Sequence, residues 1–177
     1  MRIKSKILGT ALFISLATAC TSDRLKVDVS DQQVDIHYLN IDEQISGKSA
    51  QELNDIHRKL TQELTDLYQY ELSFNLRQIG QNQTPNDTAI GEKLYYFYQQ
   101  EFIQKLEKEK AQAFDIPLLE NKIKEGFKHV KYHFPDAPLP TELIWMNNLF
   151  AKVHASDSAI SVGLEFYLGE DNEMIKN

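Results

Sequence analysis

Apolar residues recur every three or four positions in three long stretches of the chain, a spacing that places them on one face of a helix. The first stretch opens with a capping box, in which Ser49 is followed by Glu52. The second covers residues 90–113, and the third follows the capping residue Asp115, with Pro117 in its first turn. The apolar positions are Leu53, Ile56, Leu60, Leu64 and Leu67, then Leu94, Tyr98, Phe102 and Leu106, and finally Ile116, Leu119, Ile123, Phe127 and Val130. The pattern therefore predicts three amphipathic helices.

Strand-like patterns flank these helices on both sides. Residues 33–39 alternate between apolar and polar, residues 143–146 are bulky, and residues 159–168 form a further apolar run. The asparagines at 147–148 can turn the chain, and the polar residues 156–158 provide a tight connection. In the last run, the alternation of a strand places side chains on two opposite faces. One face would carry Leu164, Phe166 and Leu168, and the other Glu165 and Tyr167. We therefore expect one strand before the helices and a pair of strands after them.

The order of these elements indicates an α+β fold. It comprises an N-terminal strand, about three amphipathic helices and a β-hairpin-like pair of strands in a small sheet. An aromatic-rich stretch, residues 68–79, continues or kinks the first helix, and the prolines within residues 135–140 force an extended connection before the later strands. Residues 33–177 are long enough to bury one core, so we expect a single domain there.

The first twenty residues have a different character from the rest. Arg2, Lys4 and Lys6 precede an apolar run over residues 7–19, which ends in small side chains before Cys20. The run is shorter than the roughly 20 apolar residues of a membrane-spanning helix. It is typical of a lipoprotein signal peptide, cleaved before a cysteine that then carries acyl chains such as palmitate. A plain secretory signal cut at the same place, or a cysteine in the protein core, are the alternatives.

We therefore expect a signal peptide at residues 1–19, lipidation at Cys20, and a polar tether over residues 20–32. The chain has 26 acidic and 19 basic residues, a net charge of −7. Three of the basic residues lie in the predicted signal, so the remainder is more acidic still. This charge disfavours nucleic acid and anionic lipid as partners, which leaves the acyl chains as the membrane contact. With Cys20 acylated, no thiol remains for a disulfide or a cysteine metal site.

Few residues have the spacing of a catalytic or metal site. His129 and His133 lie four apart on the third predicted helix, with Glu125 one turn earlier. They sit at the end of that helix, where histidine complements the helix dipole, so a capping role is favoured over zinc. The remaining histidines are scattered, and the chain contains no H-E-x-x-H motif and no G-x-S-x-G motif. The sequence thus predicts no catalytic residues, no metal site and no cofactor.

Two blocks carry a resemblance to a known family. Residues 127–136, with Pro140 beyond them, read F-K-H-V-K-Y-H-F-P-D, and residues 161–169 read S-V-G-L-E-F-Y-L-G. These blocks resemble the gliding motility lipoprotein GldB family of Bacteroidota, with a looser similarity over residues 34–171. The resemblance implies a cell-envelope lipoprotein needed for gliding, in a motility linked to type IX secretion, and no established reaction. Family members continue beyond the second block with a helical half, so we expect a C-terminally truncated member.

The expected function is therefore a structural or interaction component of the gliding apparatus, not an enzyme. Other envelope proteins are the expected partners, and any small-molecule ligand is unknown. Surface lipoproteins of these bacteria carry several acidic residues after the cysteine, whereas Asp23 alone follows closely here, which favours an outer-membrane position facing the periplasm. Because the family looks distantly similar to zinc peptidases, the alternative is a truncated or degenerate zinc-peptidase-like lipoprotein.

Three structural expectations accompany this interpretation. Phe127, Phe134 and Pro135 should fix how the last long helix meets the sheet. Residues 163–168 should lie in a strand that packs against that helix. Tyr96 belongs to an aromatic surplus that contacts the core, another subunit or a missing half, and the core is favoured.

Overall fold

The computed structural model describes residues 27–64, 66–81, 88–149 and 153–169. Cys20, the predicted signal peptide and the first part of the predicted tether lie outside these ranges. Within them, no helix has both the length and the apolar character needed to cross a membrane.

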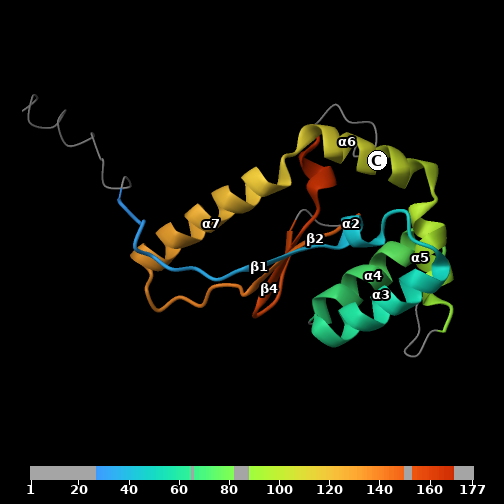
Figure 1. Ribbon diagram of the computed structural model, residues 1–177, viewed down its shortest axis with the longest axis horizontal. Coiled ribbons are helices and arrows are strands. Elements are labelled where there is room, and N and C mark those ends of the chain that lie inside the picture. The colour runs from blue at the N-terminus through green and yellow to red at the C-terminus, as the bar shows by residue number, and fades with distance from the viewer. Residues whose placement is uncertain (1–26, 65, 82–87, 150–152, 170–177) are drawn as a thin grey trace, which may run out of the picture.

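Among the described residues, four short strands form one sheet in the order β1-β2-β4-β3 (Figure 1). The strands are β1 (His37–Asn40), β2 (Glu142–Trp145), β3 (Val153–Ala155) and β4 (Ala159–Val162). β2 lies parallel to both β1 and β4, whereas β3 runs antiparallel to β4. The parallel pairing of β1 with β2 requires a long crossover, and helices α2 to α7 lie in that crossover. The α+β fold class predicted from the order of elements is confirmed.

The hairpin at the end of the fold consists of β3 and β4. Residues 156–158 connect these strands tightly, because Ser156 and Ala159 exchange hydrogen bonds across the turn, the backbone bond from Ser156 N to Ala159 O measuring 2.9 Å. The two predicted later strands, β2 and β4, are neighbours but run parallel, since the chain reaches β4 only after β3. The first strand is shorter than predicted: residues 33–36 lie beside the sheet, and pairing begins at His37.

The predicted helices form, with breaks that sequence periodicity did not show. Their bounds are α2 (Ile41–Ile45), α3 (Ala50–Glu63), α4 (Asp66–Gln78), α5 (Ile90–Tyr98), α6 (Glu101–Ala113) and α7 (Ile116–His133). The capping box of Ser49 and Glu52 begins α3, and the Asp115 side chain caps α7 by accepting a hydrogen bond from the N–H of Leu118. The predicted helix over residues 90–113 is two helices, because Gln100 adopts an extended conformation between them. This break lets α5 pack against α3 while α6 continues in a new direction.

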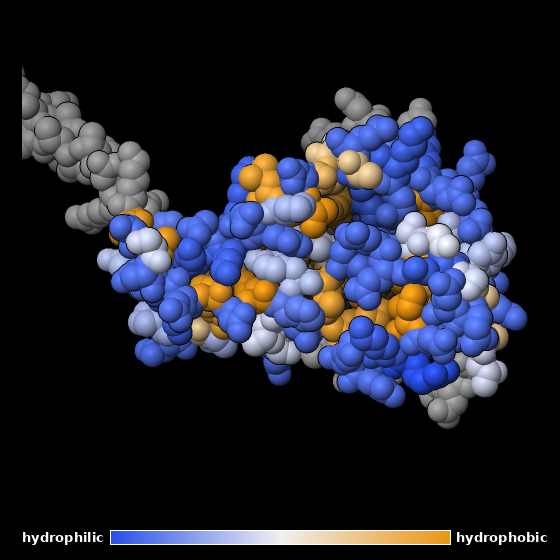
Figure 2. All heavy atoms as spheres, viewed as in Figure 1, coloured by the Kyte–Doolittle hydropathy of each residue, from blue (hydrophilic) through white to orange (hydrophobic). Residues whose placement is uncertain are grey.

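The two faces of the sheet are covered differently. Ile144 belongs to a large core made with α3, α4 and α5, whereas its neighbours Leu143 and Trp145 pack with residues of the long helix α7. Ile123 and Phe127 are the middle of the apolar stripe with which α7 meets this second face. No side chain of α7 is fully buried among the described residues. Figure 2 accordingly shows hydrophobic surface between the part of the molecule that holds α7 and the helical bundle.

The structure corrects the expectation for the last apolar run. β4 ends at Val162, and Leu164–Tyr167 form a short 3₁₀ helix, η3, so the predicted alternation of faces over residues 164–168 is wrong. The chain turns at Gly163, where a Cβ would lie only 2.9 Å from the Cβ of Asn148. The turn directs Glu165 inward, where its carboxylate accepts a hydrogen bond from the buried backbone N–H of Asn148.

Two aromatic expectations also need correction. Phe127 packs against the sheet as predicted, but Phe134 is 64% exposed and does not fix the helix there. The core placement favoured for Tyr96 or its neighbours is confirmed for Phe97 and Tyr98, which are buried, and is wrong for Tyr96, which is half exposed. One face of a nine-residue helix, α5, cannot bury four consecutive aromatic residues.

Candidate functional site

Buried polar side chains gather where the three parallel strands end. Asp42 follows β1, Asn147 and Asn148 follow β2, and Glu165 follows β4. Asn147 and Asn148 have no exposed surface, and Glu165 is 3% exposed. The carboxyl ends of parallel strands meet at one edge of a sheet, which is where α/β proteins commonly bind ligands. The carboxyl edge is therefore the candidate site of this fold.

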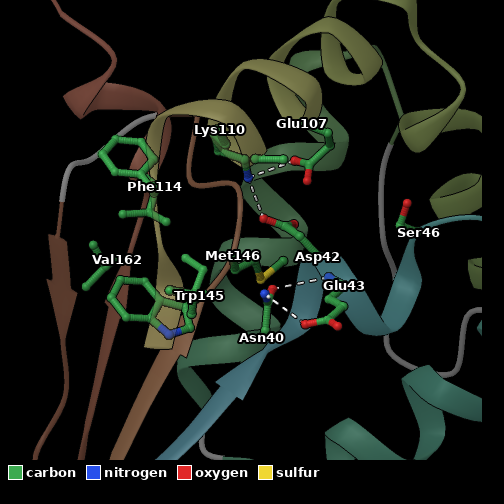
Figure 3. Close-up of a pocket in the computed structure, with 13 residues that line it drawn as sticks. Asn40, Asp42, Glu43, Ser46, Glu107, Lys110, Phe114, Trp145, Met146 and Val162 are labelled. Carbon is green, nitrogen blue, oxygen red and sulfur yellow. Dashed lines mark hydrogen bonds and ion pairs between the residues drawn. The ribbon is translucent and has the colours of Figure 1, made fainter. Parts of the chain in front are cut away.

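Lys110 is the centre of one half of this site. Its ammonium group lies 2.7 Å from Asp42 Oδ2, 2.7 Å from Glu107 Oε1 and 2.8 Å from Asn147 Oδ1 (Figure 3). Tyr98 donates its hydroxyl to the other oxygen of Asp42 at 2.7 Å. Burial would lower the pKa of Lys110, but the two carboxylates outweigh burial and raise it. Lys110 is therefore a charged group that holds α2, α6 and the end of β2 together.

Glu71 and Glu165 are the centre of the other half. Glu71 accepts hydrogen bonds from Ser161 Oγ at 2.7 Å and from the Asn148 side chain at 3.3 Å, while Glu165 accepts from the Asn148 backbone. Burial raises the pKa of Glu71 to about 7, although the Ser161 hydrogen bond opposes this. Burial likewise raises the pKa of Glu165 to about 7, against the attraction of Lys110. Near neutral pH each carboxyl group is thus partly protonated.

The two halves are joined through the backbone after β2. Asn75, one turn beyond Glu71 on α4, donates its side-chain amide to the carbonyl oxygen of Asn147. His154 of β3 places Nδ1 3.6 Å from Glu71 Oε1, and Tyr70 meets the His154 ring edge-on at 4.9 Å between centroids. The network therefore connects strands β2, β3 and β4 with helices α2, α4 and α6.

A cavity of about 360 Å³ lies beside the Lys110 half of the network. Phe114, Trp145 and Val162 lie on one side of it, and Asp42, Glu107 and Lys110 lie on the other (Figure 3). A second hollow of about 300 Å³ shares Ser46 and Glu107 with the first. Cavities of a few hundred cubic ångströms with apolar walls and a few polar groups are the usual form of ligand sites.

The sequence-predicted histidine pair is not part of this site. At the end of α7, His129 is partly buried and His133 is exposed, and Glu125 pairs instead with Lys128 at 2.6 Å. Lys131 donates to the carbonyl oxygen of Pro135 at 2.9 Å and so closes this end of the helix. No group of three or more histidine, cysteine, aspartate or glutamate side chains in the described ranges could hold a metal ion. The zinc alternative receives no support from this geometry.

Sequence reasoning missed the network because its signals were weak. The sequence indicates only that Asn147 and Asn148 can turn the chain, whereas the structure shows them fully buried and hydrogen-bonded. Glu71 and Asn75 lie one turn apart on the mainly apolar face of α4. Polar residues in such positions indicate buried groups that need hydrogen-bond partners, and this was the available signal in the sequence. Cys20, the predicted lipidation site, lies outside the described residues.

Comparison with known proteins identifies the family. The family model described as gliding motility protein GldB matches residues 22–177, which is most of the chain. The chain belongs to the GldB family. The resemblance carried by residues 127–136 and 161–169 is thereby confirmed. A comparison with curated proteins and one with solved structures found no match.

Proposed function

We propose that this GldB-family chain is a lipid-anchored envelope component of the gliding apparatus that works by binding other proteins. In this proposal residues 1–19 are a signal peptide, Cys20 carries the lipid, residues 20–32 are a tether, and residues 33–177 are a single binding domain. The family match from residue 22 onward carries the proposal, because it begins just after the predicted anchor. The family model's name, which denotes lipoproteins, also supports it.

Two physical features favour a binding role, and a third agrees with the proposed anchor. The polar cluster at the carboxyl edge is held by its own hydrogen bonds, and a rigid edge of this kind is a suitable base for an interface. The cavity beside it offers a hollow that a partner side chain can enter. The acidic charge of the chain agrees with attachment through acyl chains rather than through a basic surface. An outer-membrane position facing the periplasm is part of the same proposal.

The anchor can be tested by substitution and fractionation. Each acyl chain contributes about 0.8 kcal/mol per buried methylene group, so a multiply acylated cysteine holds a protein on a membrane almost permanently. We expect Cys20→Ser to abolish membrane attachment by acyl chains, and labelled palmitate to enter the wild-type protein but not this variant. Ser22→Ala serves as the control and should leave labelling unchanged. Palmitate labelling of the Cys20→Ser variant would contradict the anchor.

The motility role is tested in a gliding bacterium that lacks the full-length gene. Its colonies should fail to spread, and the wild-type gene should restore spreading while growth in liquid medium stays unchanged. A complementing copy with Cys20→Ser should restore it poorly. Normal spreading of the deletion strain, with no second family member in its genome, would exclude the gliding function.

A further inference from the structure

The cavity beside Lys110 has two chemically different sides. Phe114, Trp145 and Val162 form an apolar side, and Figure 3 shows the polar groups facing it from α2 and α6. Asp42 and Lys110 belong to the polar side, as does Glu107, whose carboxylate is partly exposed. A ligand that fills both sides must combine an apolar body with a polar group.

The charges around the cavity determine which polar group it accepts. Lys110 has three N–H donors, and Asp42, Glu107 and Asn147 take one each, so the ammonium group has none left for an anion. Three carboxylates line the cavity, those of Asp42, Glu107 and the exposed Glu43, whereas Lys110 is the one cation among the lining residues. The local charge is therefore negative, and an anionic ligand would be repelled while a cation would be attracted.

The apolar side adds a second requirement. A cation on a short apolar stem can lay that stem against Val162 while its charge reaches the carboxylates. Phe114 and Trp145 line the cavity as well, and aromatic rings of this kind attract cations at their π faces. Lysine and arginine side chains have this form, with an apolar stem and a charged end. A cavity of about 360 Å³ is at the lower end of the range for ligand sites, which suits one such side chain better than a large cofactor.

From these observations we infer that the cavity beside Lys110 binds a basic side chain, lysine or arginine, presented by a partner protein next to apolar residues. The assignment of the partner rests on the proposed function, whereas the chemistry of the cavity does not. The net charge of −7 agrees with a basic partner, since opposite charges favour encounter between two proteins. The partner is thus a protein with an exposed basic and apolar segment.

Trp145 provides the measurement, because it is the only tryptophan of the chain and it lines the cavity. The full-length protein in a mild detergent is titrated with the blocked peptide acetyl-Leu-Lys-Leu-amide, and with the same peptide carrying glutamate in place of lysine. We expect a saturable change of tryptophan fluorescence with the lysine peptide alone, weakened by salt. Absence of a saturable change, or equal binding of the glutamate peptide, would overturn the inference.

Two substitutions on α6 provide a matched pair. Ala111 lines the cavity and Ala113, two residues on, does not, while both are exposed. Ala111→Phe should fill the cavity and weaken peptide binding about tenfold, and Ala113→Phe should leave it unchanged. Urea unfolding of both variants shows that they are folded. Equal binding by the two variants would overturn the assignment to this cavity.

Charge and source are tested separately. Glu43→Gln, on the exposed rim, should weaken binding about threefold, and Glu92→Gln on α5 should have no effect. Free n-hexylammonium is the comparison for a small-molecule source: binding as tight as that of the peptide would overturn the protein partner. If the purified protein binds the peptide but deletion of its gene leaves gliding normal, the proposed function is refuted. If deletion abolishes gliding but the protein does not bind the peptide, only this inference is refuted.

Discussion

The two faces of the sheet contrast in how completely they are covered. On the bundle face, Ile144 is 1% exposed and belongs to a cluster contributed by five helices and two strands. On the other face, α7 covers Leu143 and Trp145 with side chains that are themselves only partly buried. Burial is the main stabilising contribution to a fold, so the bundle face should carry most of the stability.

This difference has a functional meaning. The well-packed face holds the polar network at the carboxyl edge in one arrangement, because its members lie on helices that cannot shift independently. The loosely covered face has space for the cavity between α2, α6 and the sheet. A rigid face beside an incompletely filled one suits binding. The bundle face maintains the shape of the site, and the face covered by α7 has the space that receives the partner.

The largest expected effect comes from the buried ion pair that joins the helices to the sheet. Lys110→Met leaves Asp42 buried without its cation, which should lower the free energy of unfolding by about 3–5 kcal/mol. Lys108→Met, at an exposed position of the same helix, should change it by less than about 0.5 kcal/mol. Urea unfolding followed by circular dichroism measures both. Similar values for the two variants would show that the network does not stabilise the fold.

The same substitution, isoleucine to alanine, made on each face of the sheet tests the comparison of the two faces directly. Ile144→Ala removes a side chain from the bundle core and should cost about 2–5 kcal/mol. Ile123→Ala removes a partly buried side chain of α7 and should cost about 1 kcal/mol. The same urea titrations measure the difference. Equal costs would mean that the two faces contribute alike and that α7 is better packed than its exposure indicates.

A further effect, confined to a window of pH, is the pH dependence that Glu71 gives to stability. Its pKa is about 7 in the folded protein and 4.5 ordinarily, so between these values the folded state binds more protons than the unfolded one. The free energy of unfolding therefore falls as pH rises through this window, by up to about 3 kcal/mol for this group. Glu71→Gln removes the titrating group while it can still bond Ser161 and Asn148.

Thermal unfolding at pH 5 and pH 8 measures this effect. The wild-type protein should lose more stability between the two pH values than the Glu71→Gln variant does. Glu63→Gln, at an exposed position on α3, is the control and should behave as the wild type does. A variant with the same pH dependence as the wild type would show that Glu71 is already ionised at pH 5.

Local patterns were sufficient to predict much of this fold. The capping box of Ser49 and Glu52, the cap at Asp115 and the turn at 156–158 each involve residues close in sequence, so short-range physics determines them. The same patterns failed where local preference competed with distant contacts. Residues 164–167 have the alternation of a strand, yet Glu165 turns inward to a hydrogen bond with Asn148 and the strand ends.

The sequence by itself therefore determined most of the element types, the α+β class, the family resemblance and the expected anchor at Cys20. The tertiary structure alone decided the network and the cavity, because their members come together from distant segments. Ser161 and Glu71 are 90 positions apart, and Lys110 and Asp42 are 68. Periodicity reports which face of an element is apolar, whereas a buried polar residue is recognised only when its partners are in place.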